Sequence, residues 1–177
     1  EAKDINSYDY AIIAVGAHNM EMPIPHDNSN IVSSWDVLNG QEVTGDCVVI
    51  GGGLVGAETA EYLANKGHQV TIVEMMDKIA AGESTTVLPL MMKDFADHNV
   101  KQLVNTKVDH IENNIVYTAN EQIKADTIIN ALGSKKNIFD DSSITIPHVY
   151  VGDCSGERTA DIASAIRTAY HAANEIG

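Results

Sequence analysis

Residues 48–74 read VVIGGGLVGAETAEYLANKGHQVTIVE, and this stretch contains three elements in succession. An apolar run, Cys47–Ile50, leads into three glycines, and residues 54–66 then have the Ala-, Glu- and Leu-rich composition of a helix. Gly67 is a natural end for that helix, and residues 69–73 form a second apolar run. The stretch therefore predicts a strand–turn–helix–strand unit with two buried parallel strands.

The turn after the first strand carries the pattern G-x-G-x-x-G, formed by Gly51, Gly53 and Gly56. Gly51 permits a tight turn, Gly53 leaves room for a pyrophosphate beside the backbone, and Gly56 lets the helix pack close to the sheet. Phosphates would then bind at the helix N-terminus, where free N–H groups and the helix dipole favour negative charge. Because strand, helix and second strand are all in register, we favour a dinucleotide site over a glycine-rich turn without a ligand.

Glu74 stands at the end of the second strand. Its carboxylate can accept hydrogen bonds from the hydroxyls of the adenine-side ribose and would repel a 2′-phosphate. The next residues, Met75, Met76 and Asp77, carry no positive charge, and Lys78 follows too late to replace a basic residue at this place. The alternative is a solvated charge at a strand end, but in this context the pattern favours NADH over NADPH.

The rest of the chain continues the alternation of strands and helices. Further strands are expected at residues 8–16, 101–104, 107–111, 115–118, 123–132 and 149–151, and further helices at 33–38, 85–98 and 159–176. In the last helix Ala163, Ile166, Ala169 and Ala173 share one face. The predicted fold class is α/β, with a Rossmann-like parallel sheet, helices on both faces and a small antiparallel β-meander.

Composition excludes several classes of function. The formal net charge of −14 argues against binding to nucleic acid or to an anionic membrane surface. No apolar run approaches the roughly 20 residues of a membrane span, and no signal peptide is recognisable, so a cytoplasmic setting is expected. Cys47 and Cys154 are far apart and outside any C-x-x-C pair, and the scattered histidines form no metal motif. No metal ligands and no catalytic acid, base or nucleophile are predicted.

The central segment resembles the NAD-binding domain of the FAD-dependent pyridine nucleotide-disulfide oxidoreductase superfamily. The form G-x-G-x-x-G-x-E is typical of that superfamily, and Glu58 supplies its glutamate. The resemblance implies that Glu58 faces the nicotinamide end of the site. Periodicity alone makes an exposed helix charge equally acceptable.

The flanking segments extend the resemblance over nearly the whole chain. Residues 11–16 (AIIAVG) and 129–133 (INALG) resemble the strands that lead from the FAD domain to the NAD domain and back. Residues 149–154 (VYVGDC) resemble the flavin-domain motif whose aspartate, here Asp153, contacts the ribityl chain. The sequence of these segments most resembles the C-terminal region of NADH:flavin oxidoreductases of the 2,4-dienoyl-CoA reductase and enoate reductase type. In those enzymes a barrel carrying FMN and an iron–sulfur cluster precedes this region.

The departures from the family pattern predict a fragment. The chain begins with Glu1, has one G-x-G-x-x-G unit instead of two, and lacks the barrel and the cluster cysteines. We expect an NAD-binding domain at residues 45–133 and a partial FAD-type domain at 1–44 and 134–177. The implied partners are NADH and the missing FAD-domain and barrel segments of the parent chain, and the exposed strands should otherwise be mobile or associate with another copy.

The expected function is an NADH-binding electron-entry module that positions NADH for hydride transfer to FAD, for reduction of an activated C=C bond in the full enzyme. The implied cofactors are NAD(H), FAD in the parent, and FMN and an iron–sulfur cluster in the missing part. Alternatives are the NAD domain of an NADH oxidase or a thioredoxin reductase-like flavoprotein, and a non-catalytic nucleotide-binding module. The candidate cofactor-binding residues are Gly51, Gly53, Leu54, Val55, Gly56, Glu58, Glu74, Met75, Leu132, Gly133, Gly16, Gly152 and Asp153.

Overall fold

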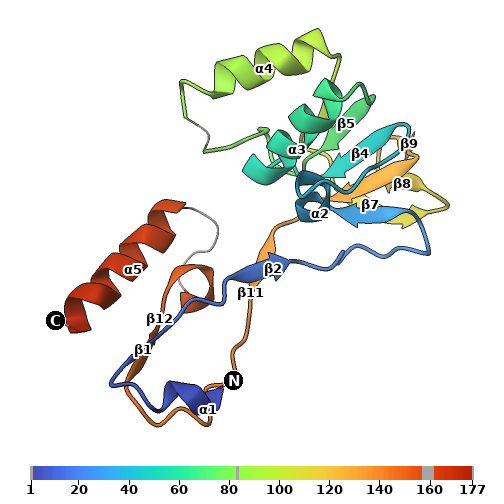
Figure 1. Ribbon diagram of the computed structural model, residues 1–177. Helices are drawn as coiled ribbons and strands as arrows, with labels where there is room; N and C mark the ends of the chain where they lie inside the picture. The colour runs from blue at the N-terminus through green and yellow to red at the C-terminus, as the bar shows by residue number, and fades with distance from the viewer. Residues whose placement is uncertain (1, 83, 157–161, 177) are drawn as a thin grey trace. The chain divides into compact units, whose positions relative to one another are not determined.

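The computed structural model describes residues 2–82, 84–156 and 162–176, which form two compact units (Figure 1). Unit 1 comprises Glu1–His18 and Ser134–Gly177, and unit 2 comprises Asn19–Gly133. The boundary differs from the expected one at residue 44, because β3 (Ile31–Ser33) pairs with β10 (Thr127–Asn130) and so belongs to the sheet of unit 2.

Unit 2 is built on a five-stranded parallel sheet in the order β3–β10–β4–β5–β6. The three remaining strands are β4 (Cys47–Ile50), β5 (Val70–Val73) and β6 (Lys101–Leu103). Every residue of β4 and β10 is buried. Strands that are buried along their whole length are expected in the centre of a parallel sheet that is covered on both faces.

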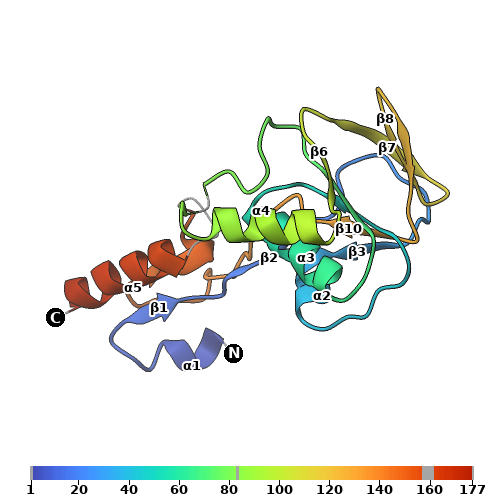
Figure 2. The same cartoon turned by 90° about the horizontal axis from the view of Figure 1, so that it is seen from above.

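The two faces of this sheet are covered by different kinds of element. The helices are α2 (Ser34–Leu38), α3 (Leu54–Asn65) and α4 (Leu88–Asp97), and the antiparallel meander consists of β7 (Val108–Glu112), β8 (Ile115–Thr118) and β9 (Gln122–Lys124). On one face Val49 packs in a cluster with Leu63 and Phe95 of the helices. On the other face Val48 packs with Val116 of the meander. Figures 1 and 2 show this arrangement.

The predicted fold class is confirmed, but two details differ. Helices were expected on both faces, whereas within the described chain the meander occupies the second face of the large sheet. The predicted strand at 123–132 is two strands, β9 and β10, which belong to different sheets. Between them the Asp126 carboxylate accepts a hydrogen bond from the Asp46 amide at 2.9 Å, which fixes the corner where the chain passes from one sheet to the other.

Unit 1 has a smaller framework. Its elements are α1 (Ala2–Ile5), β1 (Ala11–Ile13), β12 (His148–Tyr150), a 3-10 turn η1 (Gly152–Ser155) and α5 (Ile162–Ile176). β1 and β12 form a parallel pair. A second short sheet joins β11 (Ser134–Lys136) to β2 (Ala17–Asn19), whose last residue belongs to unit 2. The predicted start of the last helix at residue 159 lies outside the described residues.

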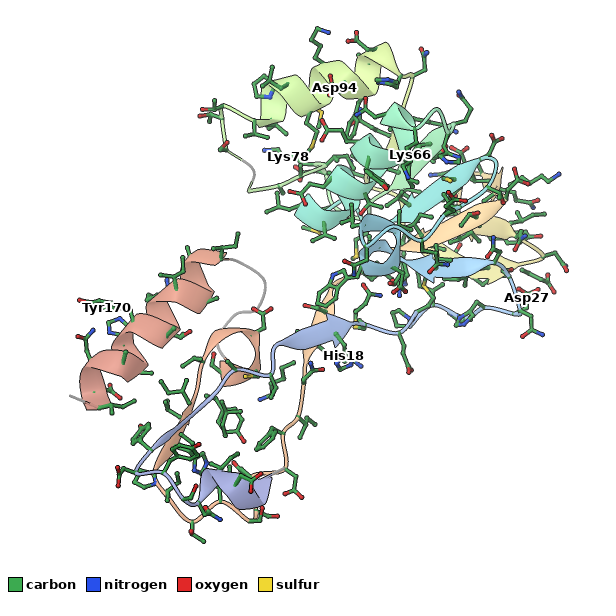
Figure 3. The ribbon with its side chains drawn as sticks, in the orientation of Figure 1. His18, Asp27, Lys66, Lys78, Asp94 and Tyr170 are labelled. Atoms are coloured by element: carbon green, nitrogen blue, oxygen red, sulfur yellow. The ribbon has the colours of Figure 1, made fainter. Side chains whose placement is uncertain are left out.

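The terminal helix α5 presents its small residues inward. Ser164 and Ala172 are buried, whereas Ile166, which was expected to share a face with Ala163, Ala169 and Ala173, is 64% exposed. Tyr170 is 66% exposed and lies on the side of α5 that is turned away from β1 and β12 (Figure 3). Within the described ranges, no helix has the length and apolar character that a membrane span requires.

Candidate functional site

Three loops of unit 2 meet at the carboxyl edge of the large sheet. Ile50, the last residue of β4, is in register with Val73 of β5 and with Asn130 of β10. The segments 51–53, 74–76 and 131–133 follow these strands directly and therefore come together. In open parallel sheets this edge is where ligands bind.

Two glycines of the turn are required by close backbone approach. Gly51 has φ +100°, and a Cβ there would lie 2.5 Å from the carbonyl oxygen of Ala131. A Cβ on Gly56 would overlap the carbonyl oxygen of Gly51. Both sites therefore exclude a side chain, which brings the first turn of α3 against the ends of β4 and β10.

Gly53 differs from these two glycines because the space beside it is open. It is the N-cap of α3, is exposed, and a Cβ at this position would meet nothing within 4 Å. No side chain caps the helix there, so the first N–H groups of α3 keep their capacity to donate. An open space in front of an uncapped helix N-terminus fits a phosphate group.

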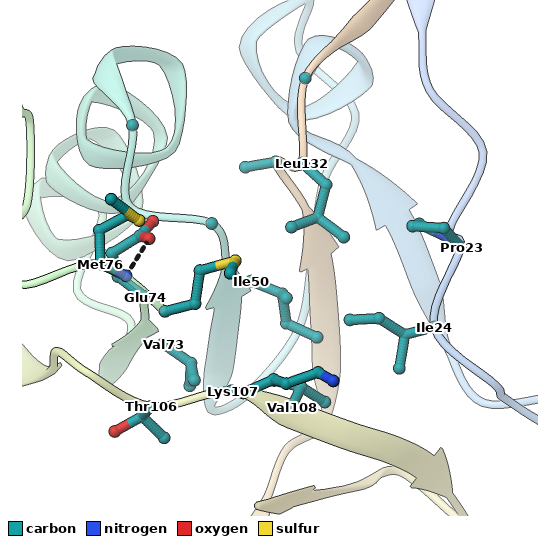
Figure 4. Close-up of a pocket in the computed structure, with 15 residues that line it drawn as sticks. Pro23, Ile24, Ile50, Val73, Glu74, Met76, Thr106, Lys107, Val108 and Leu132 are labelled. Atoms are coloured by element: carbon teal, nitrogen blue, oxygen red, sulfur yellow. Dashed lines mark hydrogen bonds between the residues drawn. The ribbon is translucent and has the colours of Figure 1, made fainter.

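The Glu74 carboxylate is buried and is oriented by two backbone amides. Its Oε2 accepts a hydrogen bond from the Gly52 amide at 2.6 Å. Its Oε1 accepts one from the Met76 amide at 2.7 Å, which Figure 4 marks with a dashed line. Each oxygen of an ionised carboxylate has a second lone pair. Because Glu74 also lines the pocket described next, it can still accept hydrogen bonds from a ligand.

A pocket of about 490 Å³ opens at this edge. Its lining is mostly apolar and consists of Pro23, Ile24, Ile50, Gly51, Gly53, Val73, Glu74, Met75, Met76, Thr106, Lys107, Val108, Ala131, Leu132 and Gly133 (Figure 4). A concave, apolar pocket with a few polar groups is the usual form of a small-molecule site. A flat aromatic ring such as adenine suits its apolar walls.

Two parts of this lining were not predicted from the sequence. One part is Thr106, Lys107 and Val108, which follow β6. Lys107 brings to the pocket a positive charge that does not lie beside Glu74 in the sequence. Lys78, which was considered, is exposed and is not among the lining residues. No local signal marks Lys107, because only the parallel pairing of β6 with β5 carries the chain past Glu74.

The second missed part is the loop that contributes Pro23 and Ile24. This loop is held to the turn between β7 and β8, where the Asn113 amide donates to Asp27 Oδ2 at 2.9 Å and the Asn114 amide donates to Ser29 Oγ at 3.0 Å. Hydrogen bonds from the Ser29 hydroxyl and the Asn113 amide lower the pKa of Asp27. Asp27 lies at the tip of unit 2 in Figure 3.

The predicted site residues divide into three groups. Those that line the pocket are Gly51, Gly53, Glu74, Met75, Leu132 and Gly133. Those that lie on α3 outside the pocket lining are Leu54, Val55, Gly56 and Glu58, of which Glu58 is exposed. Those that belong to unit 1 are Gly16, Gly152 and Asp153.

The three residues of unit 1 follow its two parallel strands. Ile13 of β1 pairs with Tyr150 of β12, and the Val151 amide donates to the Ile13 carbonyl at 2.9 Å. Gly16 and Gly152 both have left-handed backbones, with φ +68° and +66°. Unit 1 therefore has its own strand-end edge, which brings the expected flavin motifs together.

The described residues were also compared with the requirements of a metal site and of a reactive cysteine. No group of three or more His, Cys, Asp and Glu side chains suited to a metal ion occurs among them. Cys47 and Cys154 are both buried, as expected for small apolar residues. Burial raises the pKa of the Cys47 thiol to about 11, so this cysteine is no thiolate nucleophile at neutral pH.

The chain is similar to known proteins over most of its length. The family model described as "Pyridine nucleotide-disulphide oxidoreductase" matches residues 2–175. The chain is 44% identical over 177 residues to bilirubin reductase of Mediterraneibacter gnavus (strain CC55_001C), covering 95% of this chain and 28% of that relative. It is 48% identical over 80 residues to NADH oxidase of Thermoanaerobacter brockii, covering 42% of this chain and 12% of that relative.

Among solved structures, the chain is similar to a 2-naphthoyl-CoA reductase in complex with 2-naphthoyl-CoA. The TM-score is 0.80 at 28% identity, covering 96% of this chain and 27% of that chain. The chain thus spans little more than a quarter of the length of bilirubin reductase and of this structure.

Proposed function

Because the chain belongs to the pyridine nucleotide-disulphide oxidoreductase family, we propose that unit 2 binds NADH and presents it for hydride transfer to a flavin. The resemblance drawn from the sequence is thereby confirmed at the level of the family, whose oxidoreductases use FAD and NAD(H). The observation that carries the proposal is the open, uncapped N-terminus of α3 at Gly53, beside the buried Glu74 carboxylate.

Each part of the site has a task in this proposal. The N–H groups at the start of α3 bind the pyrophosphate, and Glu74 accepts hydrogen bonds from the adenine-side ribose. The apolar walls, such as Val108, exclude water from the adenine. Leu132 and Gly133 follow β10, across β4 from Glu74, so they border the nicotinamide end. NADH supplies the hydride, and the protein supplies binding and orientation.

Unit 1 contributes the flavin side in the same proposal. Gly16, Gly152 and Asp153 stand at its strand-end edge, with Asp153 proposed to contact the ribityl chain of FAD. The Gly152 amide donates to Thr168 Oγ1 at 2.8 Å, which anchors this turn to α5. Glu58, at the exposed face of α3, is proposed to face the nicotinamide end.

In this proposal the final electron acceptor is an organic substrate that contains an activated C=C bond. Two similar proteins support this class of acceptor, since both bear the names of reductases of organic compounds, bilirubin and 2-naphthoyl-CoA. NADH oxidase is the second candidate, favoured by the 48% identity over 80 residues. Consumption of O₂ by the protein that contains this chain, without an organic acceptor, would distinguish the oxidase from the reductase.

Titration calorimetry with NADH tests the nucleotide proposal. Gly53→Val should abolish detectable binding while the thermal unfolding midpoint stays close to that of the unmodified chain, because its side chain would occupy the phosphate space and touch no core residue. Ala81→Val, at an exposed loop position, adds similar bulk and should bind normally. Normal NADH binding by Gly53→Val would place the phosphate elsewhere and refute the proposed site.

A further inference from the structure

The middle residue of the glycine turn, Gly52, is enclosed by the segment 74–80. Its amide donates to Glu74 Oε2 at 2.6 Å, and its carbonyl oxygen accepts from the Ala80 amide at 2.7 Å. Gly52 is buried, and a Cβ there would lie 2.5 Å from Ile79 Cδ1 and 3.0 Å from Glu74 Cβ. The backbone of the turn is therefore held on both sides by one loop that is distant in sequence.

Glu74 joins this turn to two further segments. Its Oε1 accepts from the Met76 amide at 2.7 Å, which bends the chain after β5 back onto the carboxylate. The Thr106 amide donates to the Glu74 carbonyl at 2.8 Å, and the Asn105 amide donates to the Met76 carbonyl at 2.8 Å. A buried carboxylate that accepts from two amides makes strong, charge-assisted hydrogen bonds. Glu74 thus lies where the ends of β4, β5 and β6 are tied together.

We propose that Glu74 is a positioning residue for the phosphate-binding turn, in addition to its task at the ribose. It holds Gly52 so that the turn and the start of α3 are assembled before the nucleotide arrives. This inference rests on the proposed function, since it assumes that the turn binds a pyrophosphate. It adds that the affinity for the phosphate end depends on Glu74 even when no ribose hydroxyl is present.

Glutamine at position 74 separates the two tasks. Its side chain keeps one accepting oxygen but places an NH₂ group against the second amide, so either Gly52 or Met76 loses its acceptor. A buried N–H without an acceptor is costly, and the turn would relax toward water. Loss of a negative charge near the pocket should by itself strengthen the binding of an anionic ligand. The two effects therefore have opposite signs.

The probe is 2′,3′-dideoxyadenosine 5′-diphosphate, which keeps adenine and pyrophosphate but has no ribose hydroxyl. Its affinity should fall about tenfold in Glu74→Gln, with ADP falling further. Asp77→Asn removes the same charge from an exposed position near Glu74 and should bind both ligands at least as well as the unmodified chain. An unchanged or increased affinity of Glu74→Gln for the dideoxy probe would overturn the inference.

A second variant and a second measurement keep the test decisive. Gly52→Ala retains the carboxylate but crowds Glu74 and Ile79, so it should also lower the affinity for the dideoxy probe. An unchanged affinity in this variant would count against the inference. Amide hydrogen exchange of the ligand-free chain should become faster in Glu74→Gln at whichever of Gly52 and Met76 loses its acceptor, and should stay unchanged at both in Asp77→Asn. If the unmodified chain binds neither ADP nor NADH, the proposed function fails, whereas the exchange result still decides whether Glu74 holds the turn.

Discussion

The two units use the same local pattern with different support. In unit 2 the glycine turn follows a strand that lies within a five-stranded sheet, with buried clusters on both faces. In unit 1 the turns follow a two-stranded sheet, and α5 leaves Ile162, Ile166 and Tyr170 at least 64% exposed. These three residues are spaced by four positions and so form one apolar stripe on the helix.

This difference shows that a sequence motif can be present without the packing that holds a binding site in place. Parallel strand ends followed by glycines occur in both units. Among the residues that the structure describes, packed layers hold them from both sides in unit 2 alone. A motif supported by two apolar clusters should resist change except where the backbone itself is crowded. A motif supported by one strand pair should depend on further contacts and on local polar bonds.

The largest expected effect is on the stability of unit 2. Gly56→Ala places a Cβ onto the carbonyl oxygen of Gly51, and backbone cannot move aside as a flexible side chain can. We expect a loss of about 3 kcal/mol or more, which corresponds to a melting temperature lowered by roughly 6–12 °C. Calorimetric or circular-dichroism melting measures it.

Gly53→Ala is the matched control for that substitution. It adds the same methyl group to the same helix start, but into open space, so the melting temperature should stay close to that of the unmodified chain. Equal melting of both variants would show that the close approach of α3 to the sheet is not a source of stability. A strong loss in Gly53→Ala would contradict the view that its surroundings are open.

The next effect concerns unit 1, whose strand pair β1–β12 is a smaller framework than the five-stranded sheet of unit 2. We expect the purified chain to be colourless, because FAD needs a phosphate cradle of its own, and the one G-x-G-x-x-G unit lies in unit 2. We also expect concentration-dependent self-association through the apolar stripe of α5, seen by light scattering. Ile166→Lys together with Tyr170→Lys should shift the chain toward the monomer.

A yellow chain with stoichiometric flavin that stays monomeric would contradict both expectations. Substitution of Leu90, which is 64% exposed on α4 of unit 2, by Lys is the control for added charge. It should leave the association unchanged. If Leu90→Lys alone abolished association, the contact would belong to unit 2 and the contrast between the units would need revision.

The sequence predicted the elements that carry strong local signals. The run Cys47–Ile50, the glycine turn, α3 and β5 were all recognisable, because apolar strands and a helix-forming composition follow one another within 27 residues. The strands β2, β3 and β11 were not recognised, since sequences such as AHN and SKK show no strand pattern. Their partners across the sheet, which determine them, are distant in the chain.

The site was predictable to a similar degree. Glu74 was identified by its place at a strand end, but its bonds to Gly52 and Met76 depend on how the loop folds back. The wall formed by Lys107 and Ile24 comes from segments that carry no motif. The orientation of α5 was not predictable, because the spacing of its apolar residues does not reveal which face finds a partner.

A smaller effect is expected in nucleotide preference. Glu74 should repel a 2′-phosphate, so NADH should bind about tenfold more tightly than NADPH, a difference of roughly 1.4 kcal/mol. Titration of both nucleotides by fluorescence measures the ratio. Lys107→Met removes the positive charge that lines the pocket and should leave the preference intact or increase it. Equal affinities, or tighter NADPH, would contradict the assignment of Glu74.

The smallest effect lies in a polar cluster of unit 1, where apolar support is weakest. The Tyr150 hydroxyl donates to Asp141 Oδ2 at 2.7 Å, and His148 Nε2 lies 3.2 Å from the same oxygen. These contacts hold the segment before β12 onto that strand. The bond to Asp141 raises the pKa of Tyr150 to about 12, and the bonds from Tyr150 and His148 lower the pKa of Asp141.

The sign of the pH dependence follows from these shifts. Tyr150 is neutral in the folded chain between pH 10 and about 12, where an unfolded tyrosine is ionised, so its contribution to stability is lost as the pH rises through that window. Phenolate absorbance should show one tyrosine titrating near 12 that is missing in Tyr150→Phe. Asp141→Asn should return that pKa toward 10, because the bond to Asp141 is the largest cause of the shift. Asp140→Asn should lower it much less, because Asp140 acts on Tyr150 only through its charge and bonds to Ser142 instead. A Tyr150 that ionises near pH 10 would show that the cluster does not hold in solution.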